Sequence, residues 1–310
     1  MLWYESLDKK ITDHLPDLTY EKDVPMSQHT SFRIGGPAKR MAFPVNGKQM
    51  VMLIDFAKQC GAQVLVIGNG TNLLIADAGL DCLVINTTKM NGIETPVYDG
   101  IAAEKEVFAM AGATLAGVAN FACKRGLTGL EFAHGIPGTV GGAVCMNAGA
   151  YGGEMKHVLK GAAVLFPGEG VKFLSVDALD LGYRHSLLSD RTDAVVLYAV
   201  FCLEKGEELT IRESMRELMA RRKKSQPLEY PSAGSTFKRP TGYFAGTLIE
   251  QTGLKGLTVG GAQVSEKHAG FVINIGGATC ADVKELIAKV QNEVFQASGV
   301  HLEPEVKIIG

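Results

Sequence analysis

The chain has 310 residues, enough for two domains with buried cores. Its composition, 46% hydrophobic and 21% charged, is ordinary for a soluble globular protein. A formal charge of −2 gives no electrostatic reason to expect nucleic acid or an anionic membrane as a partner. The first residues lack the pattern of a signal peptide, and no stretch approaches the roughly 20 apolar residues that span a bilayer. We therefore expect a cytoplasmic protein.

The six cysteines and seven histidines are scattered along the chain. No Cys-x-x-Cys pair occurs, and the histidines lack the short spacings of metal ligands. This pattern indicates buried, reduced thiols and no metal site.

The first predicted elements alternate between helices and strands. Apolar residues at helical spacing predict a helix over residues 49–60, with Gly61 at the position of a C-cap. A second helix is expected from the capping residue Thr114 to Gly126. Buried strands are predicted at residues 63–67, 82–86, 107–111 and 194–203.

A polar break at residues 204–208 marks the predicted boundary between two domains. Thr210 and Glu213 have the spacing of a capping box, so we expect a helix to begin there. A last helix is predicted over residues 280–297, with Gly299 behind it.

Glycine is abundant, at 37 residues, and it is clustered. A Rossmann fingerprint would need glycine where Leu73 stands, and no Walker A sequence occurs. Residues 68–72 follow a predicted strand and could present N–H groups to a diphosphate, although such loops are more often structural. Residues 131–153 are less ordinary, because they hold seven glycines with almost no charge. That composition favours a backbone wrapped against a large ligand.

Four motifs in this order carry a resemblance to a known family. They are Thr30-Ser31-Phe32-Arg33-Ile34-Gly35-Gly36, the segment beginning Gly135-Ile136-Pro137-Gly138, Gly182-Tyr183-Arg184-His185-Ser186, and Gly234-Ser235-Thr236-Phe237. With them, and with the terminal residues 302–310, the chain resembles the UDP-N-acetylenolpyruvoylglucosamine reductases over nearly its whole length. The spacing from Arg184 to Ser235 resembles the shorter subclass, which lacks an inserted tyrosine-bearing loop.

The resemblance implies an α+β fold. A two-lobed FAD-binding domain of the vanillyl-alcohol-oxidase type is expected at residues 1–205, with its flavin core at about 30–200. A smaller α+β substrate-binding domain should follow at residues 206–303. Residues 304–310 should form a strand that returns to the active site.

The resemblance also implies FAD as cofactor and NADPH as hydride donor. Some relatives of the wider fold attach the flavin covalently through a histidine in the first loop. Residues 68–72 contain none, so we expect non-covalent FAD. The expected FAD contacts are Arg33, Gly35, Gly68, Asn69, Gly70, Thr71, Asn72, Gly135, Ile136, Pro137, Gly138, Thr139, Gly141, Gly142 and Ala143.

The implied reaction is the reduction of UDP-N-acetylglucosamine enolpyruvate to UDP-N-acetylmuramate in peptidoglycan synthesis and cell wall biogenesis. A hydride from flavin N5 reaches C3, and Ser235 matches the family's proton donor to C2. Without the resemblance, a serine after glycine in a turn is more often structural. Arg184 matches the cation that holds the carboxylate with two hydrogen bonds. Glu305 matches a third catalytic group, but local sequence does not separate it from Glu303.

Four further residues are expected to contact the sugar nucleotide: Tyr183, Lys224, Lys238 and Arg239. The charge of Lys224 also suits the C-terminal end of a helix dipole. The expected partner is this small molecule, and the protein is expected to be a monomer or weak dimer. Two alternatives are a related FAD-dependent oxidase or dehydrogenase acting on another substrate, and a catalytically inactive sugar-nucleotide-binding protein. The choice between NADPH and NADH stays open.

Overall fold

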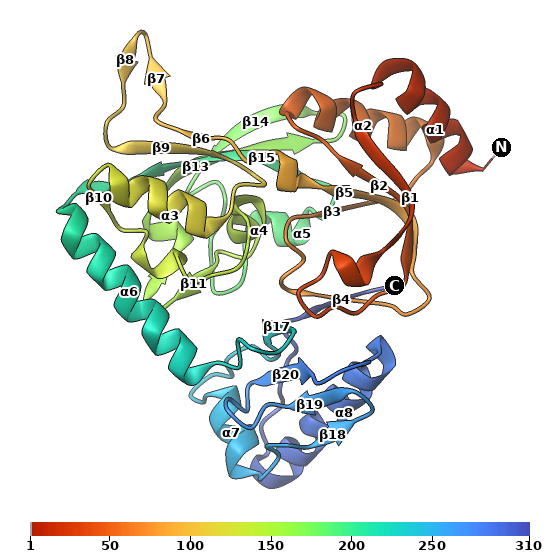
Figure 1. The fold of residues 1–310 in the computed structure, drawn as a ribbon, viewed down its shortest axis with the longest axis vertical. Helices are drawn as coiled ribbons and strands as arrows, with labels where there is room; N and C mark the ends of the chain where they lie inside the picture. Colours follow the sequence, from red (N-terminus) through yellow and green to blue (C-terminus); the bar gives the residue numbers. More distant parts are fainter. Residues whose placement is uncertain (1) are drawn as a thin grey trace. The chain divides into compact units, whose positions relative to one another are not determined.

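The computed structural model describes residues 2–310, which form two compact units (Figure 1). Unit 1 contains the described residues up to 22, with residues 40–69 and 82–220, and unit 2 contains residues 23–39, 70–81 and 221–310. The chain passes from unit 1 to unit 2 after residues 22, 69 and 220, the last of these within helix α6 (Glu208–Ser225). The functional boundaries predicted after residues 205 and 303 concern where ligands bind, and they stay predictions.

One lobe of unit 1 is built on a four-stranded sheet and two helices. Helix α2 (Gly47–Cys60) begins where the Asn46 side chain accepts a hydrogen bond from the Gln49 N–H, and it ends at Gly61, which has a left-handed φ of 69°. Helix α1 (Trp3–His14) packs against α2. In order across the sheet, the strands are β1 (Thr19–Pro25), β2 (Pro37–Phe43), β5 (Leu80–Asn86) and β3 (Val64–Ile67), of which β3 and β5 are parallel.

The other lobe of unit 1 contains a five-stranded antiparallel sheet, and helices α3 (Leu115–Lys124) and α4 (Val140–Cys145) contribute to its core. The Thr114 hydroxyl caps α3 by accepting a hydrogen bond from the Gly117 N–H. The strand order is β14 (Gly170–Ser175), β13 (Leu159–Phe166), β15 (Val195–Cys202), β9 (Glu106–Met110) and β6 (Ile93–Glu94).

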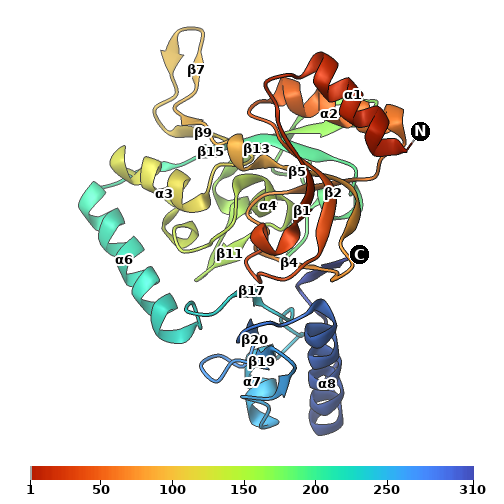
Figure 2. The same cartoon turned by 45° about the vertical axis from the view of Figure 1, so that its right-hand side comes forward.

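Short elements complete unit 1. The hairpin of β7 (Val97–Tyr98) and β8 (Ile101–Ala102) projects from the five-stranded sheet in both views (Figure 1, Figure 2). The others are β10 (Leu127–Thr128) with β16 (Glu204–Lys205), β11 (Gly149–Ala150) with β12 (Gly153–Glu154), helix α5 (Leu187–Asp190), and the 3₁₀ turns η2 (Thr87–Lys89), η3 (Glu131–Ala133) and η4 (Met155–His157).

Unit 2 has an antiparallel sheet packed against helix α8 (Cys280–Ser298). Its strand order is β17 (Ser232–Ser235), β20 (Phe271–Asn274), β19 (Ala262–Val264) and β18 (Thr258–Val259). Helix α7 (Ala245–Gln251) packs against α8, β21 (Lys307–Ile309) pairs in parallel with β4 (Leu73–Ile75), and the turn η1 (Met26–Gln28) lies near the start of the unit.

Most of the predicted elements are confirmed within one or two residues: the helices α2, α3 and α8 and the strands β3, β5, β9 and β15. The capping box is wrong, because α6 begins at Glu208 and Thr210 lies inside its first turn. The polar residues predicted as a break contain strand β16, which pairs with β10. The Ile211 N–H donates to the Glu207 carbonyl at 3.0 Å, so helical hydrogen bonding begins before Thr210. Among residues 2–310 the six cysteines form no disulfide, but Cys202 is exposed and Cys60 and Cys145 are only half-buried, so the prediction of buried thiols is wrong for these three.

Among residues 2–310, no helix has both the length and the apolar character needed to cross a membrane.

Candidate active site

Two of the predicted flavin segments are joined inside unit 1. The Asn69 side chain donates a hydrogen bond to the Pro137 carbonyl at 2.8 Å. A Cβ atom at Gly68 would stand 2.0 Å from the Thr139 hydroxyl, so only glycine fits there. The end of strand β3 is therefore held directly against residues 135–143.

Some of the glycines in residues 131–153 are required by packing alone. A Cβ at Gly153 would meet the Phe132 ring at 2.4 Å, and one at Gly149 would meet the Gly153 carbonyl at 2.6 Å. At Gly142 such an atom would lie 3.9 Å from the Thr139 hydroxyl, an ordinary contact. Glycine at 142 is thus not required by that neighbour, which suits a place where a ligand approaches the backbone.

Residues 131–153 also contain a buried polar side-chain atom, the Nδ1 of His134. Within residues 2–310 the Nδ1 atom of His134 is buried and makes no hydrogen bond. Burial lowers the pKa of His134, so its imidazole is neutral near pH 7. An unpaired buried nitrogen and a cradle of glycines fit a large polar cofactor such as FAD.

The remaining predicted flavin contacts lie in unit 2. Gly70 has a left-handed φ of 62°, and a Cβ there would stand 2.1 Å from the His29 carbonyl. Gly35 is excluded from bearing a side chain by Ile75, whose Cβ would lie 2.8 Å away. Arg33 has a left-handed φ of 56°, and Asn72 donates to the Glu305 carbonyl at 3.1 Å. Thr71 lies in the same loop as Gly70. Ala143 belongs instead to unit 1, where it is buried in the hydrophobic core and its N–H donates to the Thr139 carbonyl at 2.9 Å.

Arg184 occupies a strained position in unit 1. Gly182 and His185 form a tight turn, in which the Gly182 N–H bonds to the His185 carbonyl at 3.1 Å and the reverse bond is 3.3 Å. Arg184 is the third residue of this turn and has a φ of 53°. Glycine or asparagine is preferred there, because a Cβ atom makes the left-handed conformation costly.

The turn is attached to the end of α4 by two side chains. Asn147 donates a hydrogen bond to the Gly182 carbonyl at 2.9 Å, and the Ser186 hydroxyl donates to the Cys145 carbonyl at 2.8 Å. The Arg184 guanidinium lies 5.2 Å from the centre of the Tyr183 ring, which is itself 52% exposed. Arg184 also reaches the Gly149 carbonyl, at 3.5 Å.

Ser235 ends strand β17 in unit 2. Ser232 pairs with Ile273 and Ser235 with Phe271, so β17 carries one residue more than β20 between these pairs. Gly234 lies in this bulge with a left-handed φ of 77°. Bulges redirect side chains, and the Ser235 side chain is exposed.

Glu303 and Glu305 have different surroundings, although a regular strand begins only at Lys307. The Glu303 carboxylate forms an ion pair with Lys238 and is 69% exposed. Glu305 is half-buried, and its N–H donates to the Thr236 carbonyl at 2.8 Å. The backbone of Glu305 is therefore fixed directly beside the residue that follows Ser235.

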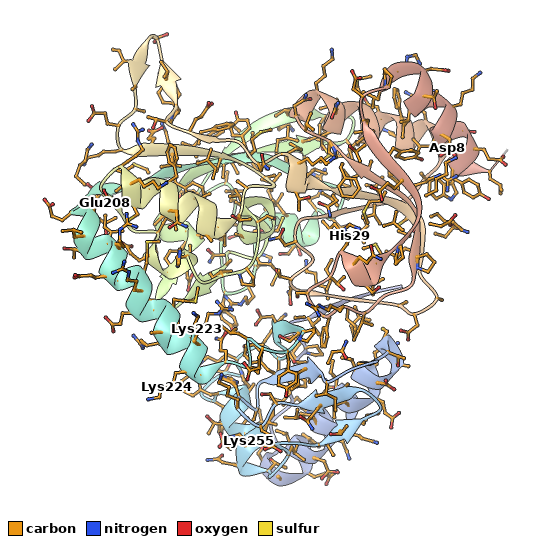
Figure 3. The ribbon with its side chains drawn as sticks, in the orientation of Figure 1. Asp8, His29, Glu208, Lys223, Lys224 and Lys255 are labelled. Carbon is orange, nitrogen blue, oxygen red and sulfur yellow. The ribbon has the colours of Figure 1, made fainter. Side chains whose placement is uncertain are left out.

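The predicted substrate contacts in unit 2 are all cationic. Lys238 is already paired with Glu303. The Arg239 guanidinium lies 4.0 Å from the centre of the Phe244 ring, a cation–π contact. Lys224 is exposed in the last turn of α6 (Figure 3), as the helix-dipole interpretation also predicts.

The structure thus groups the predicted residues into two sets. Unit 1 holds Gly68, Asn69, residues 135–143, Tyr183 and Arg184, whereas unit 2 holds Ser235, Glu305, the three substrate cations, Arg33, Gly35 and residues 70–72. The sequence reasoning did not select Asn147, Thr236 or His134. For Asn147 a signal existed, because asparagine tolerates left-handed φ and precedes a glycine cluster. For the buried Thr236 there was none.

Two family models match most of the chain. Residues 38–173 match the FAD binding domain, and residues 226–309 match the C-terminal domain of UDP-N-acetylenolpyruvoylglucosamine reductase. With the mixed helices and strands of both units, these matches confirm the α+β fold prediction and FAD as the cofactor. A distant likeness to an alkyldihydroxyacetonephosphate synthase, at a TM-score of 0.50 and 16% identity, concerns the fold alone; it covers 65% of this chain and 44% of that one.

Closer relatives match over almost the full length. The UDP-N-acetylenolpyruvoylglucosamine reductase of Agathobacter rectalis is 52% identical over 97% of this chain and 98% of its own. That of Caldanaerobacter subterraneus is 45% identical over 99% of both. The crystal structure of the Thermus caldophilus reductase has a TM-score of 0.79 and 34% identity, covering 94% of this chain and all of its own. The chain therefore belongs to the UDP-N-acetylenolpyruvoylglucosamine reductase family and is an FAD-containing oxidoreductase.

Proposed function

We propose that this protein catalyses the NADPH-dependent reduction of UDP-N-acetylglucosamine enolpyruvate to UDP-N-acetylmuramate in peptidoglycan synthesis. Family membership supports the reaction class. The observation that carries the proposal is the conformation of Arg184, whose left-handed φ costs free energy that glycine would avoid. An arginine kept in such a place, in a turn attached by two side chains, is best explained by what its guanidinium does.

FAD would be held non-covalently by the two glycine-rich segments, with Arg33 and Gly35 as further proposed contacts. When bound and reduced, FAD supplies a hydride from N5 to C3 of the enolpyruvyl group. The Gly68–Thr139 packing and the Asn69–Pro137 hydrogen bond keep the two segments of unit 1 in place before the cofactor arrives. NADPH is the proposed source of the reducing electrons.

Arg184 would bind the substrate's carboxylate. Its guanidinium stays charged and can donate two parallel N–H bonds to that group. Negative charge spreads from C2 onto the carboxylate as C3 gains the hydride, so a fixed cation there lowers the barrier. The Tyr183 ring beside it would line the same site.

Ser235 would donate its hydroxyl proton to C2 and complete the saturated lactyl ether. The hydroxyl must then recover a proton from solvent, which its exposed position permits. Glu305 would orient the reacting group or assist this proton transfer. Lys238, Arg239 and Lys224 are proposed contacts to the substrate's diphosphate and sugar.

The test separates the two half-reactions in the Ser235→Ala holoenzyme. Reduction of the flavin by NADPH should be unchanged, whereas its reoxidation by UDP-N-acetylglucosamine enolpyruvate should slow by about a hundredfold or more. Ser232→Ala is the matched control, since it removes a hydroxyl from the same strand and keeps the carbonyl that accepts from Ser31. Equal losses in both half-reactions would mean that Ser235 shapes the flavin site and donates no proton.

The same preparation discriminates the alternatives. The reductase should be yellow, and denaturation should release FAD. Turnover with oxygen but not with the enolpyruvyl substrate would favour an oxidase acting on another compound. A protein that binds the sugar nucleotide and cannot be loaded with FAD would be an inactive binding protein.

The domain roles and the cellular setting are part of the same proposal. Residues 1–205 would bind FAD, residues 206–303 the substrate, and residues 304–310 would return Glu305 to the reaction site. We also propose a cytoplasmic monomer or weak dimer without nucleic acid or membrane partners. Cell fractionation and sedimentation of the purified holoenzyme at several concentrations test these points.

A further inference from the structure

Asn147 lies just after helix α4 and is almost fully buried, at 1% exposure. Its backbone is left-handed, with a φ of 41°. Asparagine is one of the few residues besides glycine that adopt this conformation readily. Glycine could adopt this backbone conformation equally well, so the presence of asparagine indicates that its side chain has a role.

The Asn147 amide makes three hydrogen bonds to separate parts of unit 1. Its nitrogen donates to a Glu154 carboxylate oxygen and to the Gly182 carbonyl, each at 2.9 Å. Its oxygen accepts from the Lys156 N–H at 3.0 Å. Two acceptors and one donor surround this side chain, and a neutral amide matches that set whereas a carboxylate does not.

The Glu154 carboxylate is kept ionised by its neighbours. Burial alone would raise the pKa of this group, but hydrogen bonds from Lys156 and Asn147 lower it. An ionised carboxylate is a stronger acceptor than a neutral one, so it fixes which way the Asn147 amide points. The second amide hydrogen is then directed at Gly182.

Gly182 opens the turn that carries Arg184. Its carbonyl accepts both the Asn147 amide at 2.9 Å and the His185 N–H at 3.3 Å. The Asn147 side chain therefore bonds to the same carbonyl oxygen that accepts the hydrogen bond closing the turn. A left-handed arginine persists only where surrounding contacts hold the backbone, and this bond is one such contact.

We propose that Asn147 is a positioning residue for the reductase reaction, which holds the Gly182–His185 turn so that the Arg184 guanidinium meets the substrate's carboxylate. This inference rests on the proposed role of Arg184. Asn147 itself touches neither substrate nor flavin in the proposal. Its effect must therefore pass through Arg184, and a double-mutant cycle measures that dependence.

The experiment uses FAD-loaded, NADPH-reduced protein and measures the second-order rate constant of reoxidation by UDP-N-acetylglucosamine enolpyruvate. Asn147→Gly removes the amide without straining the backbone, and Asn147→Asp keeps the volume should the glycine variant fold poorly. Either change should slow reoxidation about tenfold or more and leave NADPH reduction within about twofold. In an Arg184→Ala background the same change should cost less than about twofold further.

Asn86→Gly is the matched control. Asn86 is another buried asparagine of unit 1, and its side chain accepts from the Thr88 N–H far from this turn in the sequence. Whatever Asn86→Gly costs should be the same factor with Arg184 or alanine at position 184.

Two results would overturn the inference in different ways. If Arg184→Ala is slow and the full Asn147→Gly loss persists on top of it, Asn147 acts independently and only the positioning role fails. If Arg184→Ala reoxidises at the wild-type rate, the proposed role of Arg184 fails and the positioning role fails with it.

Discussion

The Arg184 turn of unit 1 and the Ser235 strand of unit 2 both contain a residue with a left-handed backbone, but they place it differently. Both present a candidate reactive side chain at a point where the chain becomes left-handed. In unit 2 the glycine before the serine takes the positive φ, 77° at Gly234. In unit 1 the arginine takes it itself, 53° at Arg184, and Asn147 and Ser186 hold its turn. In unit 2 a neighbouring glycine adopts the left-handed conformation at little cost, whereas in unit 1 hydrogen bonds stabilise a left-handed arginine.

The largest expected effect comes from replacing Arg184, which tests the left-handed residue of unit 1. Arg184→Ala and Arg184→Gly should both slow reoxidation by the enolpyruvyl substrate by about 10²- to 10³-fold. The glycine variant should nevertheless unfold with a free energy about 1 kcal/mol higher than the alanine variant, because it relieves the left-handed strain. Stopped-flow kinetics and urea unfolding measure the two quantities.

Arg191 provides the control for that prediction. Its φ is −102°, an ordinary value, and it lies in the same part of unit 1. Here the glycine variant should be less stable than the alanine variant, since glycine gains only unfolded-state entropy. A glycine variant at 184 that is also the less stable one would remove the argument from strain.

The second prediction sharpens the unit 2 side. Glu305→Gln should slow reoxidation about a hundredfold if its carboxyl assists the proton transfer. Glu303→Gln should cost less than about threefold, because its exposed ion pair with Lys238 contributes little. Similar losses in both variants would show that the two carboxylates were assigned wrongly.

The third prediction uses an ordinary ion-pair site in unit 1 as a reference without left-handed strain. Burial alone would raise the pKa of Asp8, but hydrogen bonds from Arg40 and Lys22 lower it to about 2. The Arg40 fork contacts both Asp8 oxygens, at 2.6 and 2.8 Å, and its side chain is only 7% exposed. Asp8 lies on helix α1 (Figure 3), Lys22 on β1 and Arg40 on β2, so these ion pairs connect the helix to both strands.

Asp8→Asn should lower the free energy of unfolding by about 3 kcal/mol at pH 7, because it removes the charge from the two-oxygen ion pair with a largely buried arginine, Arg40. A depressed carboxyl pKa stabilises the fold above its unfolded value of 3.8, and this contribution is lost as the pH falls towards 2. The gap between wild type and variant should therefore narrow from pH 4 to pH 2 in acid unfolding curves. A constant gap would contradict the ion-pair explanation.

The smallest effect tests whether Gly234 absorbs strain for Ser235. Gly234→Ala should cost about 1–2 kcal/mol of stability through its backbone alone, since no described atom lies within 4 Å of the new Cβ. Gly253→Ala is closely matched, with a φ of 76° and equally open space. Both should lose similar stability, but only Gly234→Ala should slow reoxidation. Equal kinetics in the two variants would mean that the bulge does not direct Ser235.

Elements with strong local signals could be predicted because their causes lie within a few residues. Helix α2 has its asparagine cap and terminal glycine, and α8 has Thr279, Asp282 and Gly299. Strand β16, which directly precedes α6, was not predicted, because it pairs with the distant strand β10, with Leu127 opposite Lys205. No local pattern reports such a pairing.

The sequence by itself determined the family and the FAD cofactor and named the candidate residues, because these follow from residue types in a fixed order. Tertiary structure alone decided how those residues are held. It made Arg184 left-handed, gave the Asn147 amide its three partners, and set Glu303 apart from Glu305 by pairing it with Lys238. Each of these depends on hydrogen bonds and charges contributed by distant segments, and their geometry exists only once the chain has folded.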